Sequence, residues 1–324
     1  MACSGAHGCP RPMVQRVAAG LALTALLVAA IPAAAQAQPE PFAVSEVAPG
    51  VFVHQAPYAL ALPKNLGFVG NAGFVVGKDA VAVIDTGGSK AAGEALKAAI
   101  RARTALPIRY VINTHMHPDH VLGDAAFLGP GVTFIGHHNL PEALSARAAS
   151  YLSATERLIG PEAAEGTRVI LPDETVDTLR IIDLGERPLR LEAWPTAHTA
   201  TDLTVFDEKT STWFLGDLLF LGHVPALDGK ALGWIALLEE MKRRPAARVV
   251  PGHGPASAPW PDAAAPTERY LKRLVADVRA TVKAGGTMAE AARAAGREEA
   301  PDWKLFDDFN ARNATSAYHE LEWE

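Results

Sequence analysis

Residues 108–120 read Ile-Arg-Tyr-Val-Ile-Asn-Thr-His-Met-His-Pro-Asp-His, and they are the most informative segment of the chain. Residues 107–112 form an apolar, β-branched run, which predicts a buried strand. The side chains of His115, His117, Asp119 and His120 therefore follow a strand end, where turns can direct several side chains into one space. Imidazoles at alternate positions can reach one metal ion, while Asp119 and His120 face a second ion beside it.

Three later strand ends carry further ligand-type side chains. His198 follows a run that ends at Trp194, Asp217 follows Leu215-Gly216, and His253 lies between Gly252 and Gly254. Small neighbours let the backbone bend sharply and leave room for an ion and its water. Together with the first motif they make seven candidate ligands, which is enough for two ions with a bridging carboxylate and open positions for water.

Strand-like and helix-like patterns alternate on both sides of these motifs. Short apolar runs predict strands at 51–54, 72–76, 80–84, 107–112 and 132–135, and a second set at 175–183, 189–194, 202–206, 212–215 and 248–250. Amphipathic runs predict helices at 89–103, 139–158, 232–242 and 267–283, with Ser89 as the N-cap of the first. Two sets of strands interleaved with helices suggest two sheets packed face to face with helices outside.

The amino-terminal segment has the layout of a secretory signal peptide. Arg11 and Arg16 precede an apolar run over 17–31, and Ala35-Gln36-Ala37 supplies a cleavage site. We therefore expect a signal peptide over 1–37, a catalytic domain over 38–260, and a carboxy-terminal helical extension over 261–324 packed on the same domain. The mature protein is expected to be periplasmic or secreted, with no membrane attachment after cleavage.

Composition narrows the chemistry. Both cysteines, Cys3 and Cys9, lie within the expected signal peptide, so the mature chain has no thiol for a disulfide, a metal site or a nucleophile. Any metal must be held by histidine and carboxylate. The net charge of −6 and the lack of a basic cluster argue against a nucleic-acid partner. The expected partner is a small-molecule substrate.

The order of the seven ligands resembles the pattern of the metallo-β-lactamase superfamily, over roughly Val44 to Pro259. The resemblance implies an α/β fold, an αββα four-layer sandwich with two mixed β-sheets flanked by helices. It implies that His115, His117 and His198 hold one metal, that Asp119, His120 and His253 hold a second, and that Asp217 bridges. Asp85, in Ile84-Asp85-Thr86-Gly87, matches the superfamily's early aspartate, which orients ligands rather than binding metal.

The residue at position 217 discriminates between branches of that superfamily. Class B1 and B2 β-lactamases carry a cysteine there, whereas Asp217 is similar to the glyoxalase II and general-hydrolase branch. The signal peptide, residues 111–120, residues 216–234 and residues 250–255 together resemble the quinoprotein relay system zinc metallohydrolases. That resemblance implies a possible functional link to a periplasmic quinoprotein dehydrogenase.

The expected function is that of a zinc-dependent hydrolase with two Zn²⁺ ions per chain, Fe or Mn being alternatives. A hydroxide held between the ions would attack an ester, thioester or lactone carbonyl, with Asp119 and Asp217 as the catalytic carboxylates. His223 and Trp234 are candidates for the substrate pocket. The alternatives are a class B3-like β-lactamase, a mononuclear iron persulfide dioxygenase-like enzyme, and a non-catalytic metal-binding maturation partner.

Overall fold

Strand β4 (Val81–Ile84) shows how the layers of this protein arise from its sequence. All four of its side chains are buried, and successive side chains of a strand point to opposite faces. Ala82 and Ile84 join a core that lies between two sheets, whereas Val81 and Val83 join a second core on the other face. A strand that is apolar on both faces needs cover on both faces, and the sheet that contains β4 has it.

Two sheets of seven and five strands contain all the strands of the described residues. The first follows chain order: β1 (Ser45–Ala48), β2 (Val51–His54), β3 (Ala72–Val76), β4, β5 (Ile108–Ile112), β6 (Thr133–His137) and β7 (Glu174–Val176). The second has the order β12 (Arg248–His253), β11 (Thr212–Phe220), β10 (Leu203–Asp207), β9 (Pro188–Ala193) and β8 (Leu179–Asp183). Both sheets are mixed: strands β4 to β7 pair in parallel, as do β11 and β12, and the remaining pairs are antiparallel.

The helices cover the outer faces of the two sheets. They are α1 (Lys90–Arg101), α2 (Pro118–Val121), α3 (Leu140–Ile159), α4 (Pro161–Ala164), α5 (Ala231–Met241), α6 (Ala264–Lys283), α7 (Met288–Ala294) and α8 (Phe306–Leu321), with 3₁₀ turns at Pro63–Asn65, Leu122–Ala126 and Arg297–Asp302. The predicted N-cap is confirmed, because the Ser89 side chain accepts a hydrogen bond of 3.1 Å from the backbone N–H of Ala92.

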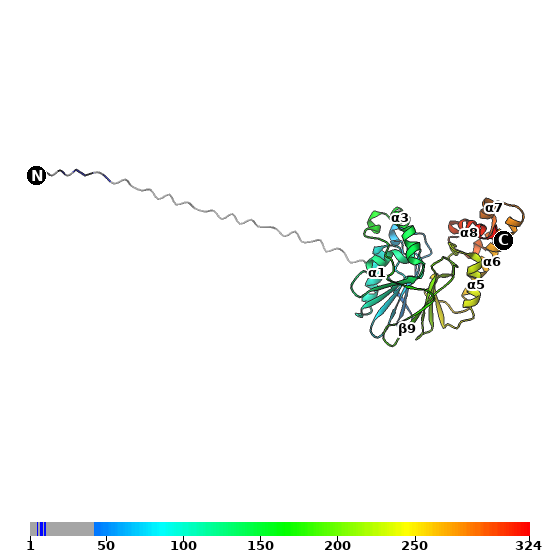
Figure 1. The fold of residues 1–324 in the computed structure, drawn as a ribbon, viewed down its shortest axis with the longest axis horizontal. Helices are drawn as coiled ribbons and strands as arrows, with labels where there is room; N and C mark the ends of the chain where they lie inside the picture. Colours follow the sequence, from blue (N-terminus) through cyan, green and yellow to red (C-terminus); the bar gives the residue numbers. More distant parts are fainter. Residues whose placement is uncertain (1–4, 6, 9, 11–41) are drawn as a thin grey trace. The chain divides into compact units, whose positions relative to one another are not determined.

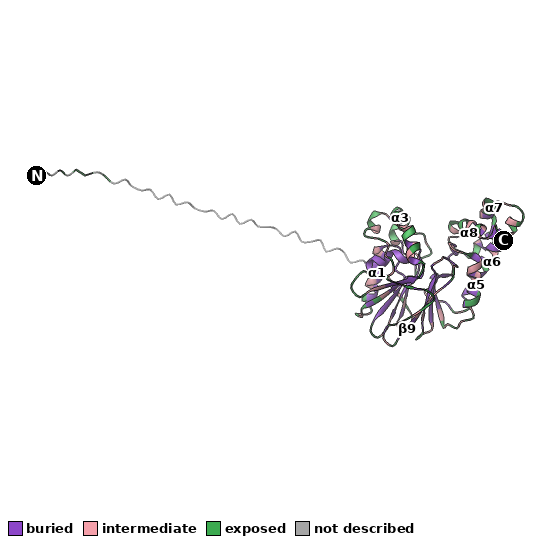
Figure 2. Cartoon of the chain, viewed as in Figure 1, coloured by how far each residue is buried: buried purple, intermediate pink, exposed green. Residues whose placement is uncertain are grey.

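Three of the four apolar cores among the described residues hold these layers together. The core between the sheets contains Ile84, Ile112 and Phe214, and the outer core of the first sheet packs Val83 against Leu96 of α1. The outer core of the second sheet packs Trp213 against Trp234 of α5. Figure 2 shows the buried residues concentrated in the sheets and on the helix faces turned toward them. The predicted αββα sandwich is confirmed (Figure 1).

The structure is a computed structural model that describes Gly5, His7, Gly8, Pro10 and residues 42–324. The predicted signal peptide and its cleavage site otherwise lie outside the described residues. Residues 42–324 fall within one compact unit. Within it, Tyr270 of α6 and Ala314 of α8 share the outer core of the second sheet. The domain boundary at residue 260 stays a prediction.

Two strand predictions need correction. The run 175–183, predicted as one strand, forms β7 in the first sheet and β8 in the second, joined by Asp177 and Thr178. A continuous strand pattern does not reveal where the chain leaves one sheet for another. The strand predicted at 212–215 continues to Phe220, because residues 216–220 go on pairing with β12 after a register shift.

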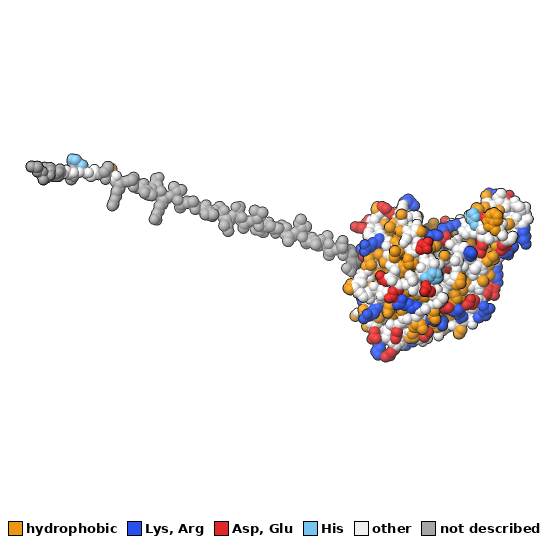
Figure 3. All heavy atoms as spheres, viewed as in Figure 1, with side chains coloured by type: hydrophobic (Ala, Val, Ile, Leu, Met, Phe, Trp, Pro, Cys, Tyr) orange, Lys and Arg blue, Asp and Glu red, His pale blue; other side chains and the backbone are white. Residues whose placement is uncertain are grey.

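The surface of the described unit carries both signs of charge. Figure 3 shows basic and acidic side chains interspersed over the face drawn. Among the described residues, no helix is both long enough and apolar enough to cross a bilayer.

Candidate metal centre

The seven candidate ligands come together although they are spread over 139 positions of the chain, from 115 to 253. The 115–120 segment follows β5, and its last residues form α2. His198 lies in the loop between β9 and β10, Asp217 lies within β11, and His253 is the last residue of β12. They form two clusters: the first ligand group is His115, His117, His198 and Asp217, and the second ligand group is Asp119, His120 and His253.

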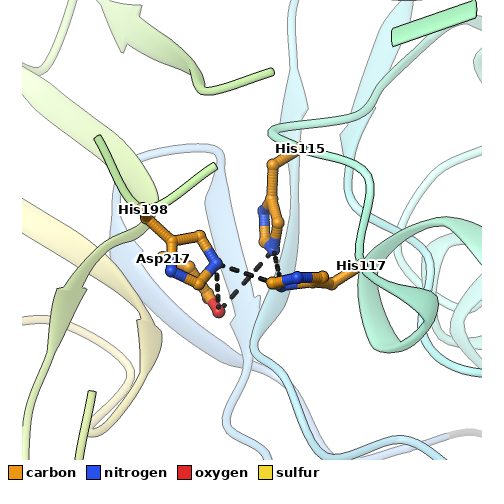
Figure 4. A group of neighbouring side chains, drawn as sticks. All are labelled: His115, His117, His198 and Asp217. Atoms are coloured by element: carbon orange, nitrogen blue, oxygen red, sulfur yellow. Dashed lines mark hydrogen bonds and ion pairs between the residues drawn. The ribbon is translucent and has the colours of Figure 1, made fainter. Parts of the chain in front are cut away.

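The first ligand group converges on one point (Figure 4). Nδ1 of His117 lies 3.2 Å from Nε2 of His115 and 3.0 Å from Nε2 of His198. Oδ2 of Asp217 lies 3.6 Å from Nε2 of His115 and 3.4 Å from Nε2 of His198. Zn–N bonds of about 2.0–2.1 Å place tetrahedral ligand atoms about 3.3 Å apart, so these spacings suit a four-coordinate cation.

The second ligand group lies on the other side of Asp217. Oδ2 of Asp119 lies 3.4 Å from Nε2 of both His120 and His253. Asp217 borders this group too, because its Oδ1 lies 3.2 Å from Nε2 of His120 and its Oδ2 lies 3.4 Å from Nε2 of His253. The Asp217 carboxylate thus contacts imidazoles of both groups.

Hydrogen bonds behind the first ligand group fix the proton of each imidazole on its outward nitrogen. His198 donates from Nδ1 to the Ala226 carbonyl at 2.6 Å, and His117 donates from Nε2 to Asp228 at 3.1 Å. The Thr114 hydroxyl donates to Asp85 and therefore accepts from Nδ1 of His115 at 3.0 Å. In each ring the inward nitrogen is left with a lone pair.

Asp85 holds the two groups in relation to each other. It follows β4 with a left-handed φ of 57° and is almost fully buried. Its carboxylate accepts from the backbone N–H and hydroxyl of Thr114 and from Nδ1 of His120, each at 2.8 Å. Asp85 therefore aims His115, through Thr114, and His120 directly, and it belongs to neither ligand group.

The donor set fits a cation better than any neutral arrangement. Three lone pairs and a carboxylate oxygen converge in the first group, and such an arrangement repels itself unless a positive charge lies among the atoms. Nε2 of His120 and Oδ1 of Asp217 are buried and have no hydrogen-bond partner among the described residues. Buried polar atoms normally have partners, and an ion would supply one for both.

The protonation pattern agrees with that fit. Burial lowers the pKa of His198 to about 3, against the attraction of Asp217. Burial also lowers the pKa of His253, but the carboxylates of Asp217 and Asp119 outweigh it and raise that pKa to about 9. Burial would raise the pKa of Asp217, but the neighbouring imidazoles, His253 first, hold it well below its usual range. Without a metal ion, the negative charge of the carboxylates in the second ligand group is thus balanced by protons on the imidazoles. A bound cation would replace these protons.

Two glycines allow the backbone to approach the ligands. Gly216 has a φ of 52°, and a Cβ there would lie 2.6 Å from the Thr114 hydroxyl. A Cβ on Gly252 would lie 1.9 Å from Oδ1 of Asp217. The sequence analysis set Asp217 at the end of a strand; it lies inside β11, where Gly216 marks the register shift that re-aims the strand.

A cavity of about 360 Å³ opens beside the ligands. Of the two residues predicted to line the substrate pocket, one lines this cavity and the other does not. His223 lines the cavity, and its Nδ1 donates to the Val224 carbonyl at 2.6 Å. Trp234 does not line it, which corrects the prediction. Its indole is fully buried behind His198, with ring centroids 5.2 Å apart, and donates to the Leu218 carbonyl. An aromatic residue near a ligand in sequence terms can equally belong to the core.

Asp228 and the cavity wall from α8 were not predicted from the sequence. Oδ2 of Asp228 accepts from His117 and, at 2.8 Å, from Arg147 of α3. Phe309 and Arg312 of α8 line the cavity. No signal in the sequence points to these residues, because each stands outside any motif and its partners are 80 or more positions away, as with the 111 positions between His117 and Asp228.

Comparisons with known proteins agree with this architecture. A metallo-beta-lactamase from Pontibacter korlensis superposes with a TM-score of 0.57 at 21% identity, over 71% of this chain and 98% of that one. The DIM-1 metallo-beta-lactamase gives a TM-score of 0.55 at 16% identity, over 72% and 97%. The sec-alkylsulfatase Pisa1 from Pseudomonas sp. gives a TM-score of 0.65 at 15% identity, over 86% of this chain and 50% of that one. At these identities the likeness concerns the fold.

The sequence itself carries the family assignment. No curated protein matches it. Residues 66–253, more than half of the chain, match the family model of the metallo-beta-lactamase superfamily, and this segment runs from before the first ligand to the last one, His253. The sandwich fold and the histidine and aspartate clusters agree with this match, and the chain therefore belongs to the metallo-beta-lactamase superfamily.

Proposed function

We propose that this protein is a hydrolase that holds two metal ions, with zinc as the native metal. The observation that carries the proposal is the convergence of imidazole nitrogens and carboxylate oxygens in the two ligand groups. The first ion would be held by His115, His117 and His198, the second by Asp119, His120 and His253, and Asp217 would contact both. Imidazole and carboxylate also accept Fe or Mn, which are the alternative metals.

The residues around the ions then have distinct tasks. Divalent cations bound here would lower the pKa of water to about 7 and polarise a substrate carbonyl. Asp119 lines the cavity, so its carboxylate is within reach of a substrate bound there. It can take a proton from the attacking water and hand it to the leaving group. Asp85, through Thr114 and His120, keeps the ligands aimed.

The proposed reaction is hydrolysis of an ester, thioester or lactone. The bond from the acyl carbon to oxygen or sulfur breaks, the oxygen of water joins the acyl carbon, and a proton goes to the leaving oxygen or sulfur. The cavity of about 360 Å³ beside the ligands supports a small-molecule substrate, since sites for such ligands span about 300–1,000 Å³.

The cellular setting is a proposal from sequence alone. The signal-peptide pattern over 1–37 supports a periplasmic or secreted protein, and the resemblance to the quinoprotein relay hydrolases supports a link to a periplasmic quinoprotein. Cell fractionation with an antibody against the mature chain tests the first point. Recovery of the protein with the cytosol would contradict it.

Metal analysis followed by a substrate panel tests the function. We expect about two zinc ions per chain by mass spectrometry, and hydrolysis of at least one ester, thioester or lactone. The panel also holds a β-lactam, a secondary alkyl sulfate and a persulfide with oxygen consumption followed, which represent the competing activities. A metal-loaded protein that turns over none of these compounds would favour a non-catalytic metal-binding partner.

A further inference from the structure

The cavity beside the ligands has two chemically different parts. One part is formed by proposed metal ligands, namely His117, Asp119, Asp217 and His253. The rest is formed largely by aliphatic and aromatic side chains, among them Leu60 from the segment before the first 3₁₀ turn, Leu158 near the end of α3 and Phe309 of α8. A reactive centre thus continues directly into an apolar space.

The mouth of this cavity is apolar too. Leu60 and Leu158 line the cavity and belong to the few large apolar side chains that remain exposed among the described residues. Isolated exposed leucines are ordinary on protein surfaces. Leu60 and Leu158 line the same cavity, however, so they place exposed apolar surface at its boundary, and apolar surface at a cavity marks a site where a ligand can bind.

The charged groups of the cavity outside the ligands largely balance one another. They are Asp228 and Arg312. Asp228 accepts from His117 and Arg147, and its other oxygen lies 3.7 Å from Arg312, whose side chain is 65% exposed. Asn313, which also lines the cavity, is fully used by the N–H of Leu227 and by the carbonyl of Pro225 and the hydroxyl of Tyr270. Beyond the ligands, His223, Thr155 and the exposed Arg312 are the remaining polar side chains of the lining, so a polar chain would find few partners in place of the water that it loses.

We propose that the substrate is an ester or thioester of an aliphatic acyl chain, with the chain held between Leu60, Leu158 and Phe309 and its carbonyl at the ligand groups. This rests on the proposed function for the chemistry, but the acyl site itself is a separate property of the cavity. Phe309 lies on α8, outside residues 66–253 that match the family model. The carboxy-terminal helices thus determine which acyl chain is accepted.

A series of acyl esters from acetyl to octanoyl, with one common leaving group, tests the proposal on the metal-loaded protein. We expect kcat/KM to rise about fourfold per methylene until the cavity is filled, the factor that corresponds to about 0.8 kcal/mol per buried CH₂. Hydrolysis of the acetyl ester with no gain for longer chains would overturn the acyl site and leave the hydrolase proposal standing.

A binding experiment separates the two proposals if no ester is hydrolysed. The metal-loaded protein is titrated calorimetrically with butanamide, hexanamide and octanamide, which carry the chain without a charge and are not esters. We expect the dissociation constant to fall with length by the same factor of about four per methylene, with a negative heat-capacity change. Binding without hydrolysis would contradict the proposed function alone. No binding, or binding independent of length, would overturn the acyl site.

A matched pair of variants locates the site. Leu158→Gln should lower the octanoyl-to-acetyl ratio of kcat/KM, as should Phe309→Ser. Leu179→Gln is the control, because Leu179 is exposed to 55% against 54% for Leu158 but lies on β8 and does not line the cavity. An equal loss in Leu158→Gln and Leu179→Gln would overturn the assignment. So would a change of oligomeric state in Leu158→Gln with an unaltered ratio, because the leucine would then cover a second copy of the chain.

Discussion

The imidazole of His137 and the imidazoles of the first ligand group are buried, and in each ring a hydrogen bond fixes the proton on one nitrogen. The other ring nitrogen, which carries the lone pair, has a different environment in His137 than in the ligand group. In His137, Nε2 donates to the Trp194 carbonyl at 3.1 Å and Nδ1 accepts from the backbone N–H of Asn139 at 3.0 Å. In His198 the outward nitrogen donates to a carbonyl, and the inward nitrogen faces His117 and Asp217. The chain satisfies His137 by itself, whereas the ligand group is completed only by a cation.

Electrostatics alone does not separate the two places. Burial lowers the pKa of His137 to about 4 and that of His198 to about 3. Both rings are therefore neutral near pH 7. What distinguishes a ligand from a structural histidine in this protein is the direction of the free lone pair, which depends on the partner behind the ring.

Removal of one inward lone pair should have the largest effect. We expect His198→Ala to lose most of its bound metal and to reduce kcat/KM by more than about 100-fold, the upper end for changes behind a ligand. His138→Ala is the control, since His138 is exposed and far from the ligands in the chain. Metal content by mass spectrometry decides, and wild-type content in His198→Ala would refute the ligand assignment.

Acid should destabilise the fold through His137. Above pH 6.5 this ring is neutral in the folded and unfolded chain, so it contributes no pH dependence. As the pH falls from 6.5 to 4, the unfolded chain takes up a proton that the folded chain refuses, and the free energy of unfolding falls by about 3 kcal/mol at most. Urea unfolding with a chelator present, compared between wild type and His137→Gln, isolates this loss. Parallel curves for the two proteins would contradict it.

Removal of the hydrogen-bond partner behind a ligand should lower zinc affinity less than removal of the ligand itself. Asp228→Ala removes the acceptor that keeps the proton of His117 on Nε2, and we expect zinc affinity to fall about 10- to 100-fold. Asp228→Asn keeps one acceptor oxygen and should recover part of the affinity. Competition with a chromophoric chelator measures both. Identical affinities in all three proteins would mean that Asp228 does not orient the ring.

The smallest effect is expected from a change at Trp234, whose ring packs behind His198. Trp234→Phe removes the hydrogen bond to the Leu218 carbonyl and some packing, so the free energy of unfolding should fall by about 1–2 kcal/mol. Because Trp234 does not line the cavity, KM should stay within about twofold of the wild-type value. Thermal unfolding and initial rates provide the measurements. A large change in KM with unchanged stability would restore Trp234 as a substrate contact.

Sequence patterns predicted the sandwich and the convergence of the ligands for a physical reason. Ligand-type residues lie at or near strand ends beside small residues, which local patterns reveal. His115 follows a strand of the first sheet and His253 ends a strand of the second, so their meeting was predicted from the order of the seven ligands, which resembles the superfamily pattern. Asp228 and Phe309 could not be found in this way. Their roles depend on how loop 221–230 and α8 fold back over the sheets, which is a matter of tertiary packing and leaves no local motif.

The split of one predicted strand into β7 and β8 has a consequence for assembly. The described strands before Asp177 form the first sheet, and this part of the chain supplies His115, His117, Asp119 and His120. The strands after Thr178 form the second sheet, and that part supplies the other three ligands. A bound cation would therefore link the part of the chain before Asp177 to the part after Thr178, and these two exposed residues connect the two parts. Cleavage between Asp177 and Thr178 should yield fragments whose reassociation depends on zinc concentration, so that the metal takes part in building the fold as well as in its chemistry.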